Sequence, residues 1–128
     1  MPIKYNVVQK ANPSKREEEK WYASAKADGE ITFKALSKEI AQGSTTVSDT
    51  DVLAVLNDLI KSLSRHLSDG KIVRLGDFGS FQVSLSSNGE AEENKVTSAS
   101  IKNSKIVFRP GEDLRYMLTT AKYEKYSK

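Results

Sequence analysis

The chain has 128 residues, a formal net charge of +3 and no cysteine. This length suits one domain with a core of its own. No apolar run approaches the roughly 20 residues that a membrane-spanning helix needs. The start of the chain lacks the apolar segment of a signal peptide, and without cysteine there are neither disulfides nor thiolate metal ligands. We therefore expect a cytoplasmic protein with no membrane partner.

Residues 1–30 predict a β-hairpin at the start of the chain. Apolar and polar residues alternate from residue 3 to residue 7, which is the period of a strand. Asn12-Pro13 interrupts this run, residues 14–20 predict a charged turn, and residues 21–26 predict the returning strand.

Two aromatic residues, Trp21 and Tyr22, stand in the second predicted strand. Large aromatic side chains dominate the energetics of protein cores. Base stacking on nucleic acid is the other interpretation, but no basic cluster flanks these residues in the sequence. The pattern therefore favours packing.

A short helix is predicted after the hairpin. Phe33, Leu36 and Ile40 recur at helical spacing, Thr32 suits the N-cap, and Gly43 ends the pattern.

A second, longer helix follows. Ser48 and Asp51 resemble a capping box at its start, and Asp69-Gly70 ends it. Its apolar residues form a stripe wider than one short helix can cover. The stripe consists of Val52, Leu53, Val55, Leu56, Leu59, Ile60, Leu63 and Leu67. We therefore expect a further partner surface, either the sheet or a second copy of the chain.

The second half of the chain predicts three strands and a helix. Residues 71–75 predict a short strand, residues 76–79 a tight turn, and residues 81–85 an alternating strand. Residues 86–100 are polar and predict a connecting arm. Residues 101–108 then predict the third strand.

Pro110 and Gly111 interrupt the third strand, and Glu112 and Asp113 suit the positive end of a final helix. Residues 123–128 predict a frayed basic tail.

Enzymatic chemistry finds little support in these residues. His66 is the only histidine, and we expect it on the surface of its helix. One histidine without cysteine cannot build a usual metal site. Ser24 and Ser80 have no activating base nearby in the sequence. We therefore predict no catalytic residue, no metal, no cofactor and no small-molecule substrate.

Two motifs and the order of the elements carry a resemblance to a known family. The motifs are Arg74-Leu75-Gly76-Asp77-Phe78-Gly79-Ser80-Phe81 and Phe108-Arg109-Pro110-Gly111. Three further matches precede them: Thr32, Leu36, Ile40 and Ala41 in the first helix, Val52 and Leu56 in the second, and then Asp69-Gly70-Lys71. Over residues 31–121 the chain resembles the bacterial histone-like HU and integration host factor family.

The resemblance implies an α+β fold. Two N-terminal helices, a three-stranded antiparallel sheet with a β-arm and a C-terminal helix would form an intertwined homodimer. Residues 31–128 would be the HU-like DNA-binding domain, one compact unit. Residues 1–30 would be an additional N-terminal hairpin, similar to extended HU-like variants of anaerobic gut bacteria.

The resemblance also implies function. Such dimers bind double-stranded DNA without sequence specificity, bend it with their arms and organise the nucleoid. The positions that it marks for DNA binding, with the basic residues around them, are Lys71, Arg74, Lys95, Lys102, Lys105, Arg109 and Arg115. The alternative for each is an ordinary solvated charge.

The expected arm departs from the family pattern. Residues 84–105 contain Lys95, Lys102 and Lys105 against Glu90, Glu92 and Glu93, so the segment is neutral, and it contains no proline to wedge between base pairs. Glu112 stands where the family usually has lysine. Two alternatives therefore stay open: a protein-interaction module that keeps the fold with weak or lost DNA binding, and a hairpin that covers the DNA-binding face.

Overall fold

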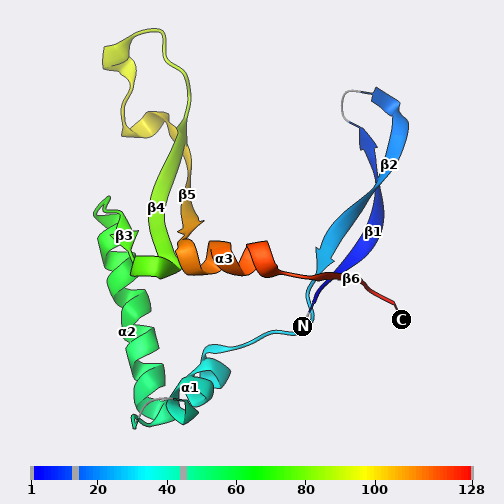
Figure 1. Cartoon of the computed structure of the whole chain (residues 1–128). Coiled ribbons are helices and arrows are strands. Elements are labelled where there is room, and N and C mark those ends of the chain that lie inside the picture. Colours follow the sequence, from blue (N-terminus) through cyan, green and yellow to red (C-terminus); the bar gives the residue numbers. More distant parts are fainter. Residues whose placement is uncertain (1, 13–14, 44–45, 128) are drawn as a thin grey trace. The chain divides into compact units, whose positions relative to one another are not determined.

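The computed structural model describes residues 2–12, 15–43 and 46–127 (Figure 1). The chain divides into two compact units, and each is described by itself. One consists of residues 1–32 and 117–128, and the other of residues 33–116.

The first unit contains a three-stranded sheet in the order β2-β1-β6. Its strands are β1 (Ile3–Asn12), β2 (Lys15–Lys26) and β6 (Tyr123–Lys125). β1 and β2 are antiparallel, in register from the pair Lys4 and Lys26 to the pair Lys10 and Lys20. The two strands thus form an antiparallel pair, and β1 lies between β2 and β6 in the sheet.

The charged turn predicted at residues 14–20 is wrong, because β2 already begins at Lys15; residues 13 and 14 lie outside the described part. Backbone pairing with β1 continues through Glu19, opposite Ala11. Tertiary pairing overrides the weak strand preference of charged residues, which is strongly dependent on context.

The C-terminal tail predicted to fray forms strand β6 instead. β6 runs parallel to β1, and Ile3 lies opposite Tyr123. The amide of Ile3 donates to the carbonyl of Lys122 (2.6 Å), and the amide of Tyr126 donates to the carbonyl of Tyr5 (2.8 Å). A short polar segment such as residues 123–128 has no periodic pattern that predicts a strand. It becomes a strand here because it pairs with the free edge of β1.

The second unit begins with two helices, α1 (Phe33–Gln42) and α2 (Asp49–Ser68). The Ser48 hydroxyl accepts a hydrogen bond from the amide of Asp51 (3.2 Å), which confirms the predicted N-cap of α2. At the other end, Asp69 is the C-cap and Gly70 follows with φ of 81°, as expected for a helix stop.

The second sheet has the order β3-β4-β5 and is antiparallel throughout. Its strands are β3 (Val73–Arg74), β4 (Gly79–Ser87) and β5 (Ile101–Pro110), and α3 (Glu112–Thr120) follows β5. Strand β3 is shorter than predicted. The amide of Lys71 donates to the His66 carbonyl to close α2, and the amide of Leu75 donates to the Gly79 carbonyl within the turn.

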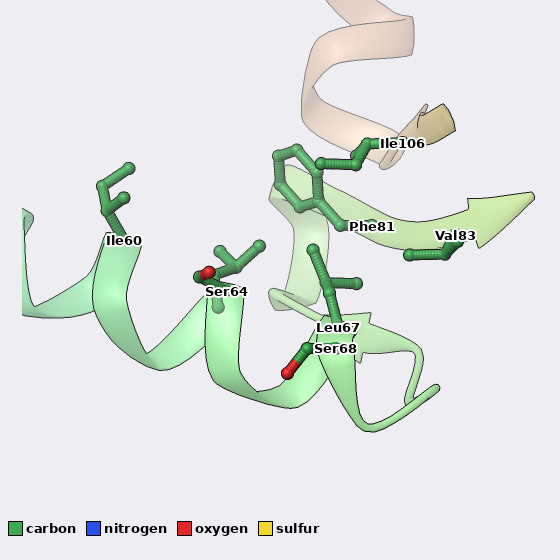
Figure 2. Close-up of a pocket in the computed structure, with 8 residues that line it drawn as sticks. Ile60, Ser64, Leu67, Ser68, Phe81, Val83 and Ile106 are labelled. Carbon is green, nitrogen blue, oxygen red and sulfur yellow. The ribbon is translucent and has the colours of Figure 1, made fainter. Parts of the chain in front are cut away.

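One face of this sheet is apolar. Phe108 packs against Phe81 with ring centroids 4.8 Å apart, and against Phe78 at 5.5 Å. Beside them an apolar hollow of about 410 Å³ separates α2 from β4 and β5, as Figure 2 shows. Ile60 and Leu67 from α2, with Ile106 from β5, are among its lining residues.

Few apolar side chains are buried in the described chain. Only Val52 and Leu67 count as buried hydrophobic residues within it. Val55 on α2 and Ile106 on β5 remain 65% and 64% exposed. The wide stripe predicted on α2 is therefore only partly covered by the chain's own sheet.

Candidate nucleic-acid interface

A tight junction holds the start of β4 against the end of β5. Residues 76–78 form a single 3₁₀ turn. The amide of Gly111 donates to the Phe78 carbonyl (2.9 Å). Gly79 has φ of 143°, and a Cβ there would lie 2.8 Å from the Phe108 ring, so no other residue fits without strain. The fold thus explains the glycine at position 79 of the first motif.

This junction fixes two arginines on one face of the sheet. Arg74 lies opposite Ser80, and Ser80 lies opposite Arg109. Residues in register on neighbouring strands share a face, so the two guanidinium groups flank the serine on the face away from Phe81 and Phe108. Ser80, considered in the sequence only as a nucleophile, is therefore placed as a hydroxyl donor between two cations.

A third arginine joins them from α3. The amide of Arg115 donates to the Gly111 carbonyl (3.0 Å), which sets Arg115 in the first turn of the helix. Arg74, Arg109 and Arg115 line one hollow of about 360 Å³, together with Ser80 and the glycines of the junction. We call this the arginine hollow.

The arginine hollow gathers three positively charged side chains in the described part of the chain. No Asp or Glu is among its lining residues. Among the described side chains, none of its three guanidinium groups forms an ion pair. Guanidinium groups donate in a planar fork that matches the oxygens of a phosphate. The arrangement is suited to hold one or more phosphates.

The remaining predicted basic residues are dispersed. Lys105 lies opposite Ser84, on the same face as Arg109. It comes four positions before Arg109 in β5, a distance of about 13 Å. Lys102 lies at a shift in the β4-β5 register, where Ser86 is opposite Asn103 and Ser87 is opposite Ile101. Lys95 belongs to a 3₁₀ turn within the arm, and Lys71 lies in the connection between α2 and β3. Of the seven predicted positions, the fold brings three together in the hollow.

The arm between β4 and β5 is folded on itself. Ser100 is 4% exposed, and its hydroxyl donates to a carboxylate oxygen of Glu90 (3.1 Å) while it accepts from the amide of Thr97 (3.2 Å). Thr97 in turn caps a 3₁₀ turn at residues 98–100. Glu90 therefore stabilises the arm, whereas Glu92 and Glu93 are exposed near its end.

Other types of site are not evident in the described residues. Among them, no group of three His, Cys, Asp or Glu side chains is arranged to hold a metal ion. None of the described helices is long and apolar enough to cross a membrane. His66, expected on the surface of its helix, is half-buried on α2.

The fold and this geometry define an α+β protein with an arginine hollow at the base of a two-stranded arm. The chain belongs to the HU-HIG family, described as an HU domain fused to a wHTH, Ig, or glycine-rich motif, whose model matches residues 1–125. A comparison with curated proteins finds none that matches this chain.

Two solved structures can be compared with this chain. One is named provisionally as a bacterial DNA-binding protein from Bacteroides vulgatus ATCC 8482, with a TM-score of 0.67 and 12% identity. The match covers 96% of this chain and 47% of that one, so this chain spans about half the length of that protein. An Anabaena HU–DNA cocrystal structure matches at 19% identity with a TM-score of 0.49, covering 70% of this chain and 98% of that one.

Proposed function

We propose that this chain is an HU-like protein that binds double-stranded DNA through the sugar–phosphate backbone, without reading base sequence. The observation that carries this proposal is the arginine hollow, where Arg74, Arg109 and Arg115 converge with no lining carboxylate. Membership of a family named for its HU domain, and the DNA-binding protein among similar structures, point the same way. Backbone contacts fix the position of a protein on DNA but carry no sequence information.

We further propose that the working form is a homodimer. The apolar hollow beside α2 and the exposed Val55 and Ile106 offer a face that one chain leaves open. An apolar face of this kind is typical of an interface between subunits. A dimer doubles the number of arginine hollows, and so the number of phosphates held. We place its action in the nucleoid of the cytoplasm. We propose that residues 31–128 are the HU-like part and residues 1–30 an added hairpin, whose sheet is completed by β6 from the end of the HU-like part.

The charge and composition of the arm indicate how it would contact DNA. A neutral arm releases few counterions, and an arm without proline has no wedge to insert between base pairs. We therefore expect the arms to lie along the duplex and bend it only weakly. Most of the affinity should come from the arm base.

Fluorescence anisotropy with a labelled duplex across a salt series tests the proposal. Replacing Arg74 and Arg109 by glutamine removes two charges from each hollow. The slope of log K against log salt should become shallower by about 0.9 for each phosphate that the variant no longer neutralises. The control variant K34Q/K61Q removes two exposed lysines from α1 and α2 and should change the slope little. Absence of binding by the wild-type protein at low salt and micromolar concentration contradicts the proposal.

The exposed Glu92 and Glu93 favour a second candidate, a protein-interaction module built on the same fold. Carboxylates at the end of the arm repel phosphate and suit a basic partner protein instead. This candidate predicts no binding to duplex DNA at any salt concentration. It is contradicted if the wild-type protein binds DNA with a salt slope that R74Q/R109Q reduces.

A further inference from the structure

The register of the β2-β1-β6 sheet sorts its side chains onto two different faces. Lys4 lies opposite Lys26, Lys10 lies opposite Lys20, and Tyr22 lies opposite Val8. All of these positions have the same parity along their strands, so they share one face. Trp21 and Val7 belong to the other face.

Tyr126 completes the lysine-bearing face. The Lys26 ammonium lies 4.0 Å from the centre of the Tyr126 ring, which places the ring beside this lysine pair. We define the lysine face as Lys4, Lys10, Lys20, Tyr22, Lys26 and Tyr126. All six residues belong to one compact unit.

Each lysine pair sets like charges directly opposite one another, which destabilises a sheet unless an anion compensates. Lys4 has such a partner in Asp28, at 3.6 Å, and Glu124 lies in register with it. Lys10 and Lys20 are exposed, and neither forms an ion pair with any of the described side chains. Among the described side chains no anion compensates the pair Lys10 and Lys20, and we take this pair as the part of the face that binds an external anion.

The spacing of the lysine pairs suits a nucleic-acid backbone. Lys10 lies six positions after Lys4 along β1, a span of about 20 Å. Each strand of a duplex carries one phosphate for about every 3.4 Å of helix axis, so a basic face of this length can lie against more than one phosphate. Tyr22 lies between the two pairs and is 43% exposed, so its hydroxyl can reach a sugar or phosphate oxygen.

We propose that the lysine face is a second DNA-binding surface, which holds the sugar–phosphate backbone of a duplex independently of the arginine hollow. The proposal extends the proposed function from one DNA contact surface on the chain to two. A lipid membrane is the other polyanion that lysines attract, but membrane-binding surfaces combine basic residues with apolar ones that enter the bilayer. Here the large apolar residue of β2, Trp21, lies on the opposite face.

The test is the full-length double variant K10Q/K20Q, measured by fluorescence anisotropy on a labelled duplex across a salt series. Near physiological salt, binding should weaken about fivefold for each phosphate that the variant no longer neutralises, and the salt slope should become shallower by about 0.9 for each. The control K34Q/K61Q, which removes the same amount of charge, should keep the wild-type slope. The melting temperature of K10Q/K20Q should not fall, because the substitution removes a repulsion.

A parallel measurement on R74Q/R109Q separates this proposal from the previous one. If K10Q/K20Q weakens binding and R74Q/R109Q does not, the lysine face stands and the arginine hollow fails. If K10Q/K20Q keeps the affinity and slope of the wild type, the lysine face is overturned. It is also overturned if K10Q/K20Q loses binding only to phosphatidylcholine vesicles that contain phosphatidylserine.

Discussion

The two three-stranded sheets of this protein gather positive charge in different ways. In the β3-β4-β5 sheet, arginines meet at a junction that glycines hold closed, and a helix contributes a further one. In the β2-β1-β6 sheet, lysines face each other in pairs across an open hairpin. The first arrangement lines a hollow, whereas the second is spread along an extended pair of strands.

This difference indicates two styles of phosphate binding. A planar guanidinium presents its donors in a fork that matches the oxygens of a phosphate, so it favours particular positions of that group. An ammonium on a flexible stem adds charge and tolerates many positions. We therefore expect the β3-β4-β5 sheet to set the register of the protein on DNA, and the β2-β1-β6 sheet to add affinity that depends strongly on salt.

The largest expected effect concerns the apolar face of the β3-β4-β5 sheet. Ile60→Asp places a charge in the apolar hollow beside α2, and we expect the homodimer to dissociate with a loss of about 3 kcal/mol or more. Analytical ultracentrifugation across a concentration series measures this change. Asn57→Asp, which adds the same charge at an exposed position of α2 outside the hollow, should keep the dimer. A wild-type protein that is monomeric throughout the series contradicts the dimer.

A smaller effect is expected at the glycine junction. Gly79→Ala forces a side chain into a backbone with φ of 143° and against the Phe108 ring, which should lower the free energy of unfolding by about 2–3 kcal/mol. Urea unfolding followed by circular dichroism measures it. Gly89→Ala is the matched control, because a Cβ there meets nothing within 4 Å and its φ is ordinary. Equal midpoints for the two variants argue against a closed junction.

The smallest effect is expected at the end of the arm. Glu92→Gln with Glu93→Gln removes two exposed carboxylates that repel phosphate, so DNA affinity should rise by about twofold to fivefold at low salt. Glu90→Gln serves as a contrast, because Glu90 accepts the hydrogen bond from Ser100 and its loss should loosen the arm instead. An affinity that falls in E92Q/E93Q indicates that these carboxylates contact a partner other than DNA.

Most elements of the HU-like part could be predicted from the sequence because their signals are local. Ser48, Asp51 and Gly70 define the ends of α2 through their own backbone hydrogen bonds and angles. The motif glycines likewise predicted the turn before β4. In contrast, the charged residues of β2 gave no local sign of a strand, and neither did residues 123–125, because both depend on pairing with β1.

The candidate sites show the same division. Arg74 and Arg109 were marked by their place beside the two motifs, and the fold brings both to the hollow. Lys102 was marked only by its charge, and it lies at a register shift of β5, outside the lining of the hollow. The lysine face was missed because its lysines are separated by up to 22 positions in the sequence, from Lys4 to Lys26. The lysine face could have been predicted only by pairing the two strands expected in residues 1–30 and working out their register.

By itself, the sequence determined the helices, the tight turn at Gly76 to Gly79 and the neutral charge of the arm. These features depend on spacing, caps and composition over a few residues. Only the tertiary structure decided which basic residues converge, where the C-terminal segment pairs and which apolar residues stay open. The physical reason is that strand register joins residues that are distant in sequence, and a shift of one position would move every side chain to the opposite face.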